Sequence, residues 1–341
     1  MLAMRKETVL LTGISGYIAL HTAKKLLREG YTVRGSVRNT AKAKEVEKTL
    51  QNASVDTANL FFTELNLNSD KGWDEAMKGC DYVIHMASPY VVAIPKDEAE
   101  VINPAVEGTL RVLKAARKGR VQRVVLTSSA LAMMGSMKTG TINPNSWTDT
   151  SADIGTYTKS KTLAEKAAWD FIEDQPMDSH KIEMVSVNPG GVFGPPLGKN
   201  IEGQAMSVVD QMLRGKVPMV ANVSMPMADV RDIAELHLQV MTAPNAVNKR
   251  VIGAAEKPNS LQEIAQILKD NGYKGPSTRL APNFLIKLAA FFDREAKGMV
   301  GFLGMNIHAD NSETRALFNW EPRSFSESVL DTAKAIKNIT G

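Results

Sequence analysis

The chain has 341 residues, 43% of them hydrophobic, and its 41 Lys and Arg exceed its 37 Asp and Glu, which gives a net charge of +4. This length corresponds to about two domains and is enough to bury a sizeable core. The single cysteine, Cys80, excludes an internal disulfide framework and every zinc or iron–sulfur cluster built from several cysteines.

The first residues and the charge pattern predict where the protein works. Residues 1–7 hold no apolar run of the kind found in a signal peptide, and no later stretch reaches the roughly 18 uninterrupted apolar residues of a membrane span. Residues 1–60 carry ten basic and five acidic side chains, so the positive charge is concentrated there. The small net charge argues against nucleic acid. We expect a cytoplasmic protein with neither a nucleic-acid nor a membrane partner.

Short β-branched runs alternate with amphipathic stretches, which is the pattern of a parallel sheet with crossover helices. The predicted strands are Thr8–Thr12, Thr32–Val37, Leu60–Leu65, Tyr82–Met86, Arg123–Ser128, Ile182–Asn188 and Arg250–Gly253. The predicted helices are Tyr17–Glu29, Ala41–Gln51, Trp73–Lys78, Asp97–Lys118, Tyr157–Glu173 and Asp229–Met241. Because the strands are apolar without alternation, helices should cover both faces of the sheet. The sequence therefore predicts a doubly wound α/β fold of the Rossmann type, with about seven strands.

The composition changes after Asn188. Residues 189–196 are dense in Gly and Pro, and the chain beyond Asn259 shows helical patterns separated by turn signals. We expect residues 1–194 and 229–254 to form the sheet domain. Residues 195–228 and 255–341 should form a smaller, mostly helical lobe that binds the substrate.

A glycine-rich turn, Thr12–Ala19, follows the first strand and opens the first helix. Gly13 permits a tight turn, Gly16 permits close approach of the backbone to a pyrophosphate, and Ala19 lets the helix pack on the strand. The N-terminus of the helix supplies free N–H groups to the phosphates. The sequence therefore predicts a dinucleotide site.

The end of the second strand indicates which dinucleotide is bound. NAD enzymes usually carry an acid here for the ribose hydroxyls, whereas this chain has Arg38 and no acid. Arg38 can pair with a 2′-phosphate, and Lys44 follows on the next helix. We therefore predict NADP(H). The alternative is that Arg38 is an ordinary exposed residue at a strand end.

Tyr157 and Lys161 stand four residues apart and therefore share one helix face. An ammonium near the phenol lowers its pKa from about 10, so the tyrosine can deliver a proton to a developing alkoxide near neutral pH. Ser129 follows the fifth strand, where its hydroxyl can bond a substrate oxygen, although a structural role in a strand-end turn is its alternative. The four-residue spacing of Tyr157 and Lys161 is informative because it follows the fifth strand and Ser129.

Taken together, these motifs resemble the extended short-chain dehydrogenases/reductases of the NAD-dependent epimerase/dehydratase superfamily. The resemblance is to the branch of dihydroflavonol 4-reductases, cinnamoyl-CoA reductases and carbonyl (aldehyde) reductases, and it extends over nearly the whole chain. Its motifs are Thr12–Ala19, Gly30–Arg38, Gly79–Pro89, Asn103–Ala105, Arg123–Ala130, Tyr157–Lys161 with Ala164–Lys166, Asn188–Pro195, Asp229–Asp232 and Trp320–Arg323.

The resemblance implies roles for single residues. Ser129 would be the catalytic serine, Tyr157 the proton donor, and Lys161 the residue that tunes Tyr157 and holds the nicotinamide ribose. The implied cofactor contacts are Gly13, Ser15, Gly16, Tyr17 and Ile18 at the pyrophosphate, Arg38 and Lys44 at the 2′-phosphate, Asn66 and Leu67 at the adenine, Met86, Ala87 and Ser88 at the adenosine side, Pro189 and Val192 beside the nicotinamide, and Thr127 with Tyr157 and Lys161. Many members have Asp where Asn66 stands, but the Asn carbonyl can still meet the adenine amino group.

The substrate pocket is expected to be soft and apolar. Plant dihydroflavonol reductases usually carry an Asn five residues after the catalytic serine, whereas this chain has Met134, which cannot donate a hydrogen bond. Met134, Met225 and Met227, together with Ser129, are the predicted pocket residues, suited to several aldehydes or ketones. The alternative is that these methionines fill the core. The five histidines show no metal-ligand spacing, so no metal site is predicted.

The sequence therefore predicts NADPH-dependent reduction of an aldehyde or ketone to an alcohol, with the proton from Tyr157, in a monomer or homodimer. Two alternatives from the same superfamily are a hydroxysteroid dehydrogenase and a nucleotide-sugar epimerase/dehydratase, and Arg38 counts against the latter. A non-catalytic NADP-sensing regulatory protein is the alternative from another class. Such proteins typically lose the Tyr or the Lys, and both are present here.

Overall fold

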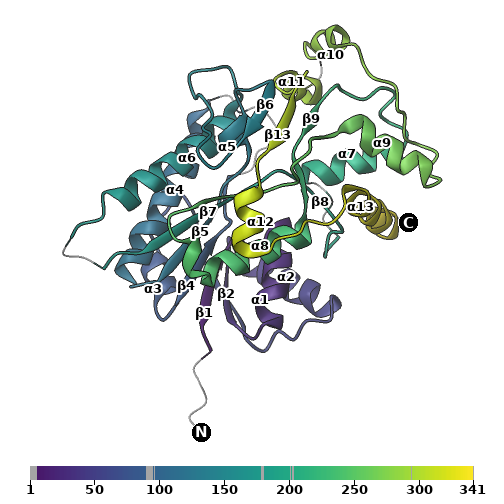
Figure 1. Cartoon of the computed structure of the whole chain (residues 1–341). Helices are drawn as coiled ribbons and strands as arrows, with labels where there is room; N and C mark the ends of the chain where they lie inside the picture. The colour runs from purple at the N-terminus through teal and green to yellow at the C-terminus, as the bar shows by residue number, and fades with distance from the viewer. Residues whose placement is uncertain are drawn as a thin grey trace.

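A seven-stranded parallel sheet forms the centre of the protein in the computed structural model, which describes residues 6–89, 95, 97–177, 180–199, 201, 203–292 and 294–340 (Figure 1). The strand order is β11-β7-β5-β4-β1-β2-β3. The strands are β1 (Thr8–Thr12), β2 (Thr32–Val37), β3 (Leu60–Glu64), β4 (Tyr82–His85), β5 (Arg123–Thr127), β7 (Glu183–Pro189) and β11 (Arg250–Gly253). The order reverses between β1 and β4, which is where ligands bind in open α/β sheets.

Helices cover both faces of this sheet because its strands are apolar on both sides. In β1, Val9 and Leu11 face one core cluster while Leu10 faces the other, and all three are fully buried. The first face carries α1 (Tyr17–Arg28), α2 (Thr40–Asn52) and α8 (Val230–Thr242). The second carries α3 (Trp73–Met77), α4 (Ala99–Lys118) and α6 (Thr156–Glu173). The predicted doubly wound fold is confirmed.

The predicted elements of this sheet and its helices are all present. Strand ends differ from the sequence expectation by at most one residue and helix ends by at most two. None of the described helices is long and apolar enough to cross a membrane.

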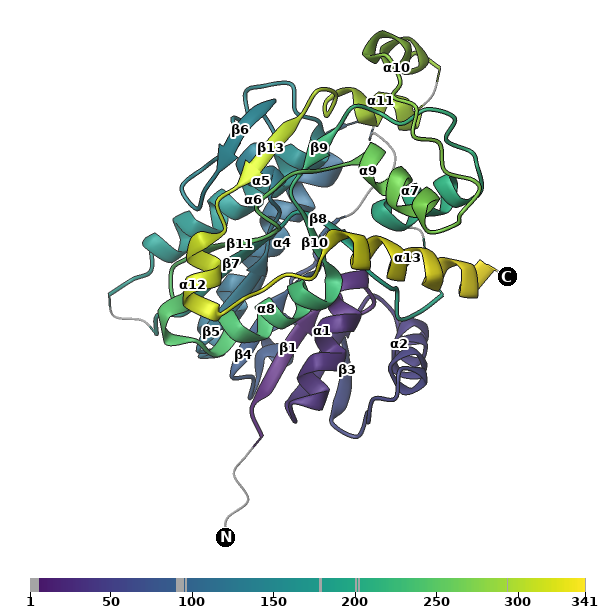
Figure 2. The same ribbon diagram turned by 45° about the vertical axis from the view of Figure 1, so that its right-hand side comes forward.

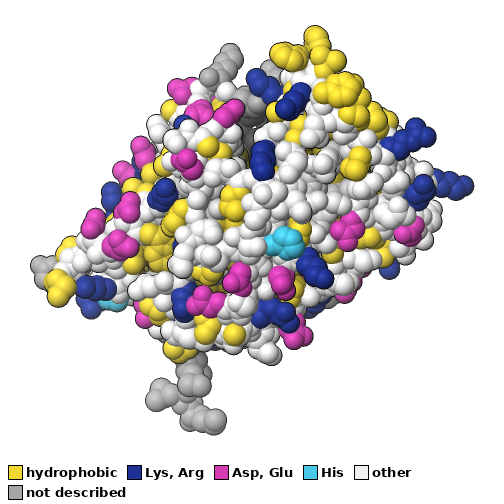
Figure 3. Space-filling view, turned by 45° about the horizontal axis from the view of Figure 1, so that its top comes forward, with side chains coloured by type: hydrophobic (Ala, Val, Ile, Leu, Met, Phe, Trp, Pro, Cys, Tyr) yellow, Lys and Arg dark blue, Asp and Glu magenta, His cyan; other side chains and the backbone are white. Residues whose placement is uncertain are grey.

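A second group of elements lies beyond the carboxyl ends of the strands, as Figure 2 shows for α7, α9 and α13. A separate apolar cluster joins these three helices through Val209, Ile264, Leu268 and Val329. The helices of this region are α7 (Gln204–Leu213), α9 (Leu261–Asp270), α10 (Asn283–Ala289), α11 (Arg294–Val300) and α13 (Phe325–Thr340). Large hydrophobic side chains are exposed on and just after α10, including Phe284, Phe291 and Phe292, and they gather at one end of the surface in Figure 3.

Two small sheets were not predicted. One pairs β12 (Asn259–Ser260), β9 (Ser224–Met225), β13 (Asn306–Ala309) and β6 (Thr139–Ile142), and the other pairs β10 (Met227–Asp229) with β8 (Gly191–Phe193). Their strands have two to four residues, too few for a visible alternation, and β6 pairs with a segment more than 160 residues away. Two short helices, α5 (Leu131–Met134) and η1 (Pro244–Ala246), complete the elements between the sheet strands.

The packing departs from the expected division of the chain at two places. Strand β6 belongs by sequence to the sheet domain but pairs with β13 of the second lobe. Conversely, Phe318 at the end of α12 (Ser312–Phe318) and Trp320 pack into the core of the large sheet beside α8. The boundaries at residues 194, 228 and 254 therefore stay a proposal.

Candidate active site

The phosphate-binding turn after β1 is held tightly between two neighbouring strand ends. Gly13 has a φ of +66°, and its N–H donates to Ser36 Oγ at 3.0 Å. A Cβ at Gly13 would lie 2.9 Å from the Cα of Ala87, so only glycine fits against the segment after β4. Ile14 packs over Gly35 of β2, where any Cβ would lie 2.5 Å from the Ile14 Cδ1. The backbone of the turn therefore approaches its neighbours as closely as a dinucleotide turn requires.

Helix α1 begins directly after this turn without a side-chain cap. Gly16 is the N-cap residue and, like Ser15, is exposed. No side chain bonds the first N–H groups of the helix from this cap, so they can meet an anion. The side chain of Tyr17 points elsewhere, because its hydroxyl donates to the Gly194 carbonyl at 2.8 Å, and Ile18 packs against the core. Any contact of Tyr17 or Ile18 with a pyrophosphate would have to be made by the backbone.

The segment after β4 is fixed by Thr12. The Thr12 hydroxyl oxygen accepts the N–H groups of Met86 at 3.1 Å and Ala87 at 3.0 Å, and it lies 2.7 Å from His85 Nδ1. Burial lowers the pKa of His85 to about 3, so its ring is neutral and Nδ1 accepts the Thr12 proton. The buried His85 ring thus helps to fix the end of β4, while Met86, Ala87 and Ser88 are half-buried and border the site.

Arg38 and Lys44 are both exposed at the carboxyl end of β2 and on α2. Between them, Asn39 caps α2 by accepting the Lys42 N–H, and Lys42 pairs with Glu45. In the described part of the chain neither Arg38 nor Lys44 forms a salt bridge. Both cations are therefore available to a phosphate.

The loop after β3 is tied to neighbouring helices. Asn66 is exposed, and its side-chain oxygen accepts the Asn68 N–H at 2.9 Å. Leu67 packs on Gly108 of α4, and its carbonyl accepts a bond from Arg111 at 2.6 Å. The Asn66 carbonyl predicted for the adenine thus already accepts one backbone hydrogen bond.

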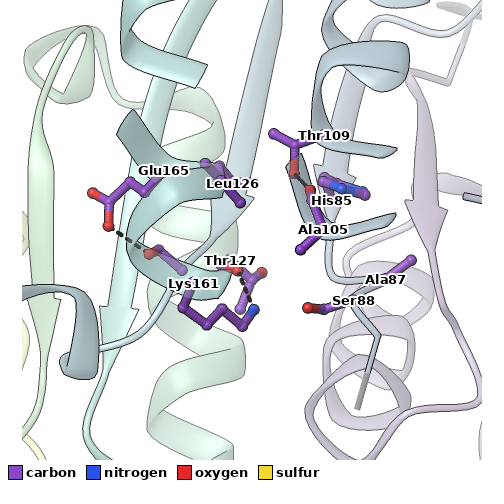
Figure 4. A pocket seen from close by; sticks show the side chains of 11 residues that line it. His85, Ala87, Ser88, Ala105, Thr109, Leu126, Thr127, Lys161 and Glu165 are labelled. Carbon is purple, nitrogen blue, oxygen red and sulfur yellow. Dashed lines mark hydrogen bonds between the residues drawn. The ribbon is translucent and has the colours of Figure 1, made fainter. Parts of the chain in front are cut away.

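Lys161, for which the sequence predicts a catalytic role, lies in a pocket at the carboxyl ends of β4 and β5, which Figure 4 shows. The pocket is lined by His85, Ala87, Ser88, Ala105, Thr109, Leu126, Thr127, Ser128, Lys161, Ala164 and Glu165. Lys161 is 9% exposed, and its Nζ donates to the Thr127 carbonyl at 3.2 Å. Burial lowers the pKa of Lys161 to about 8, against the opposing effect of Glu165. The amine is therefore still largely charged at pH 7.

Ser129 and Tyr157 are not among the residues that line this pocket, although Ser129 directly follows Ser128 and Tyr157 lies one turn before Lys161. Ser129 is half-buried, and its Oγ accepts the Leu131 N–H at 3.1 Å, which leaves the hydroxyl proton free to be donated to a ligand oxygen. Tyr157 is half-buried on the first turn of α6, which begins after Gly155 at a φ of +72°. Tyr157 and Lys161 are one helical turn apart, so they face the same way.

The strand ends beside Ser129 are also tied together. The Ala130 N–H donates to the Pro189 carbonyl at 2.8 Å, and the Asn188 side chain donates to the Ser129 carbonyl at 3.2 Å. Thr127 Oγ1 lies 2.8 Å from Nε2 of His237, whose pKa burial lowers to about 4. Pro189 is buried and Val192 is half-buried on β8.

The three predicted pocket methionines differ in exposure. Met134 is 1% exposed and packs against Ile142 and Ile252, and Met227 is 3% exposed in the helical cluster. Met225 is half-buried and contacts three clusters at once. Met134 and Met227 thus pack as the core-filler alternative describes, and Met225 is the one of the three with accessible surface.

One residue of the site was not singled out from the sequence. Glu165 lines the pocket beside Lys161 but entered only as part of the Ala164–Lys166 motif. Its signal was the four-residue spacing from Lys161, which places a carboxylate on the same buried face. Among the described residues, no group of three or more His, Cys, Asp or Glu could hold a metal ion.

Comparisons with known proteins agree with this geometry. Residues 9–254 match the NAD dependent epimerase/dehydratase family. Cinnamoyl-CoA reductase 1 of Arabidopsis thaliana is 33% identical over 268 residues, which cover 77% of this chain and 74% of that protein. The NADPH-dependent methylglyoxal reductase GRE2 of Saccharomyces cerevisiae is 28% identical over 354 residues, covering 98% and 99%. The crystal structure of yeast methylglyoxal/isovaleraldehyde reductase Gre2 complexed with NADPH has a TM-score of 0.80 and 26% identity, again over 98% and 99% of the two chains.

Proposed function

Because this chain belongs to the NAD dependent epimerase/dehydratase family, we propose that it is an oxidoreductase that uses NADPH to reduce an aldehyde or ketone to an alcohol. The resemblance to carbonyl-reducing members of that family, which the motifs indicated, is confirmed by the similarity to cinnamoyl-CoA reductase and to methylglyoxal reductase. Both relatives are named as reductases, and the second is named as NADPH-dependent.

The observation that carries the proposal is the convergence of a cofactor turn and a buried amine on one pocket. Ala87, which leaves no room for a Cβ at Gly13, also lines the pocket that holds Lys161. A dinucleotide lying along the turn would therefore extend toward the amine. This arrangement supports a redox site better than it supports a binding site without catalysis.

The residues present fit NADP(H). Gly13 and Gly16 leave space for the pyrophosphate, and Ser15 with the first turn of α1 offers backbone N–H groups to it. Arg38 and Lys44, which form no salt bridge within the described residues, offer two cations for the 2′-phosphate. Asn66, Leu67, Met86, Ala87 and Ser88 would border the adenosine half, and Thr127, Pro189 and Val192 the nicotinamide half. When bound, NADPH supplies a hydride to the carbonyl carbon.

The chain's own groups would act on the carbonyl oxygen. The Ser129 hydroxyl, whose proton is free, would donate a hydrogen bond that polarises the carbonyl. Tyr157 would deliver its phenolic proton as the oxygen gains charge. The Lys161 ammonium shares a face of α6 with Tyr157 and is held by its hydrogen bond to the Thr127 carbonyl. It would stabilise the phenolate that results and thereby lower the pKa of the phenol.

The substrate side is proposed to be the second lobe, with Met225 as an apolar and adaptable wall. This composition suits aldehydes and ketones of several shapes. We also propose that the enzyme is cytoplasmic and acts as a monomer or homodimer.

The test is NADPH oxidation, followed by absorbance, with a panel of methylglyoxal, aliphatic and aromatic aldehydes, β-keto esters, dihydroflavonols and cinnamoyl thioesters. We expect turnover with at least one carbonyl and a preference for NADPH over NADH. Absence of turnover across the panel, in protein that binds NADPH, would favour the non-catalytic sensing alternative. Equal use of the two cofactors would contradict the role given to Arg38.

A further inference from the structure

Glu165 is a fully buried carboxylate one helical turn beyond Lys161, with an exposed fraction of 1%. One of its oxygens accepts two hydrogen bonds, one from the Ser128 hydroxyl and one of 2.8 Å from the Asn188 side chain. The other oxygen accepts a bond from Arg250 Nε at 2.7 Å and one from the Trp169 indole at 3.3 Å. These donors lie directly after β5, on β7, on β11 and on α6 itself, so the carboxylate joins α6 to the ends of three neighbouring strands.

Arg250 is the counter-ion of this carboxylate and is itself held in place. Its side chain is 9% exposed, and one of its terminal nitrogens donates to the carbonyls of Pro144 and Ser146 at 2.7 and 2.6 Å. Its guanidinium lies 3.7 Å from the centroid of the Trp147 ring. A buried ion pair contributes little net stability compared with apolar residues of the same volume. The burial of two charges beside the site therefore suggests a role other than stability.

Hydrogen bonds couple Glu165 to both Lys161 and Ser129. Lys161 donates to the Thr127 carbonyl and Glu165 accepts from the Ser128 hydroxyl, so two hydrogen bonds one turn apart fasten α6 to the end of β5. The Asn188 side chain that bonds Glu165 also bonds the Ser129 carbonyl at 3.2 Å. Movement of the Glu165 carboxylate would therefore displace Ser129 and Lys161 together.

We propose that Glu165, with Arg250 as its counter-ion, is a positioning residue that holds Lys161 and Ser129 in the arrangement needed for carbonyl reduction. The inference rests on the proposed function, in which those two residues act on the tyrosine and on the carbonyl oxygen. Glu165 touches neither substrate nor cofactor in this role. It acts through the ends of β5 and β7.

Glu165 also acts on the charge of Lys161. The groups that line the pocket around the Lys161 amine are His85 from β4, Glu165 from α6, and the uncharged Ala105 and Thr109 from α4. His237 from α8 lies beyond Thr127, and Tyr157 lies one turn before Lys161 on α6. Burial keeps both histidines neutral near pH 7. Glu165 is the group in this set whose negative charge raises the pKa of Lys161, against the lowering by burial. Its removal should therefore make the amine lose its proton at lower pH.

The experiment follows the titration of Lys161 directly, by NMR of protein labelled with ¹³C at the lysine Cε, with the resonance assigned from Lys161→Arg. In Glu165→Gln the pKa of Lys161 is expected to fall, and kcat at pH 7 to fall ~10-fold or more with little change in the KM for NADPH. Arg250→Lys keeps the counter-ion charge and is expected to retain a titration close to that of the unaltered protein.

A matched control is available at the opposite end of the same strands. Glu183 on β7 pairs with the buried Arg123 on β5, so Glu183→Gln also removes a carboxylate from a buried arginine. This variant is expected to lose stability without moving the Lys161 titration. An equal shift in Glu183→Gln, or an unchanged titration in Glu165→Gln, would overturn the inference.

A second variant covers the case in which Glu165→Gln fails to fold. If Glu165→Gln does not fold, Ser128→Ala removes a single donor to the carboxylate, and we expect it to lower kcat ~10-fold while NADPH binding is kept; unchanged kcat would overturn the positioning role. The NMR titration needs no substrate. Failure of the proposed function, seen as no carbonyl turnover in the unaltered protein, is therefore distinguishable from failure of this inference.

Discussion

The amine of Lys161 donates a hydrogen bond to the main-chain carbonyl of Thr127 at 3.2 Å, which joins helix α6 to the last residue of strand β5. Thr127 precedes the two serines at the strand end, and Tyr157 lies one turn before Lys161 on the helix. This one bond therefore brings the serine and tyrosine segments to the same pocket.

Lys161→Met is expected to lower kcat ~100-fold or more, because the phenol of Tyr157 loses the neighbouring cation that eases its ionisation. Steady-state kinetics with NADPH and an accepted carbonyl measure this. Since binding of the dinucleotide through the turn and Arg38 is retained, NADPH should still bind. Unaltered kcat would exclude Lys161 from the mechanism.

In the alkaline range, the free energy of unfolding of the unaltered protein should rise with pH relative to that of Lys161→Met. The folded pKa of about 8 is below the unfolded value of about 10.4, so the unfolded chain binds more protons between these two values. The cost of burying the charged amine is present below about pH 8 and is lost as pH rises toward the unfolded pKa. Urea unfolding across this window should show a relative gain of at most about 3 kcal/mol. A relative loss would contradict the burial of a lysine with a lowered pKa.

Tyr157→Phe is expected to abolish most turnover, by ~100-fold or more, because no other proposed group delivers the proton. Because the proposed role of the hydroxyl is proton delivery and the turn at Gly13 and Arg38 are unchanged, NADPH affinity measured by fluorescence should change little. Near-normal turnover with intact folding would remove Tyr157 from the proposed mechanism.

Arg38→Ala is expected to lower kcat/KM for NADPH ~10-fold or more and to leave kcat/KM for NADH nearly unchanged, because only the 2′-phosphate loses a charged partner. Lys48→Ala is the matched control, since it removes another exposed cation from α2 without a predicted cofactor contact. Equal losses in both variants would indicate general electrostatics instead of a specific contact.

Gly13→Ala is expected to abolish NADPH binding and to lower stability. Both Gly13 and Gly79 have positive φ, at +66° and +72°, but a Cβ at Gly13 would meet Ala87 at 2.9 Å, whereas a Cβ at Gly79 would meet nothing within 4 Å. Gly79→Ala therefore isolates the backbone strain, at about 1 kcal/mol, and should keep NADPH binding. The same binding loss in both variants would contradict the contact argument.

Met134→Ala and Met225→Ala separate core packing from substrate contact. Met134 is 1% exposed, so its truncation should cost about 2–5 kcal/mol of stability. Met225 has accessible surface, so its truncation should change the KM for carbonyl substrates at a smaller cost in stability. Chemical denaturation and steady-state kinetics distinguish the two. A change in KM with unaltered stability in Met134→Ala would return Met134 to the pocket.

The large sheet, its helices and the turn at Gly13 could all be predicted from the amino-acid sequence. These features are local or strongly periodic: a buried parallel strand is a continuous apolar run, and a glycine-rich turn between strand and helix needs its residues in one short segment. The placement of Tyr157 and Lys161 on one helix face follows in the same way from a four-residue spacing.

Which distant segments meet becomes visible in the folded protein and not in the sequence. The pairing of β6 with β13 joins residues Thr139 and Asn306, and strands this short carry no periodic signal of their own. The burial of Met134 and the contact of Glu165 with Arg250 depend on the packing of β11 and the lobe against β7 and α6. A carboxylate or a methionine looks the same in the sequence whether it faces solvent or core, because its surroundings come from other parts of the chain.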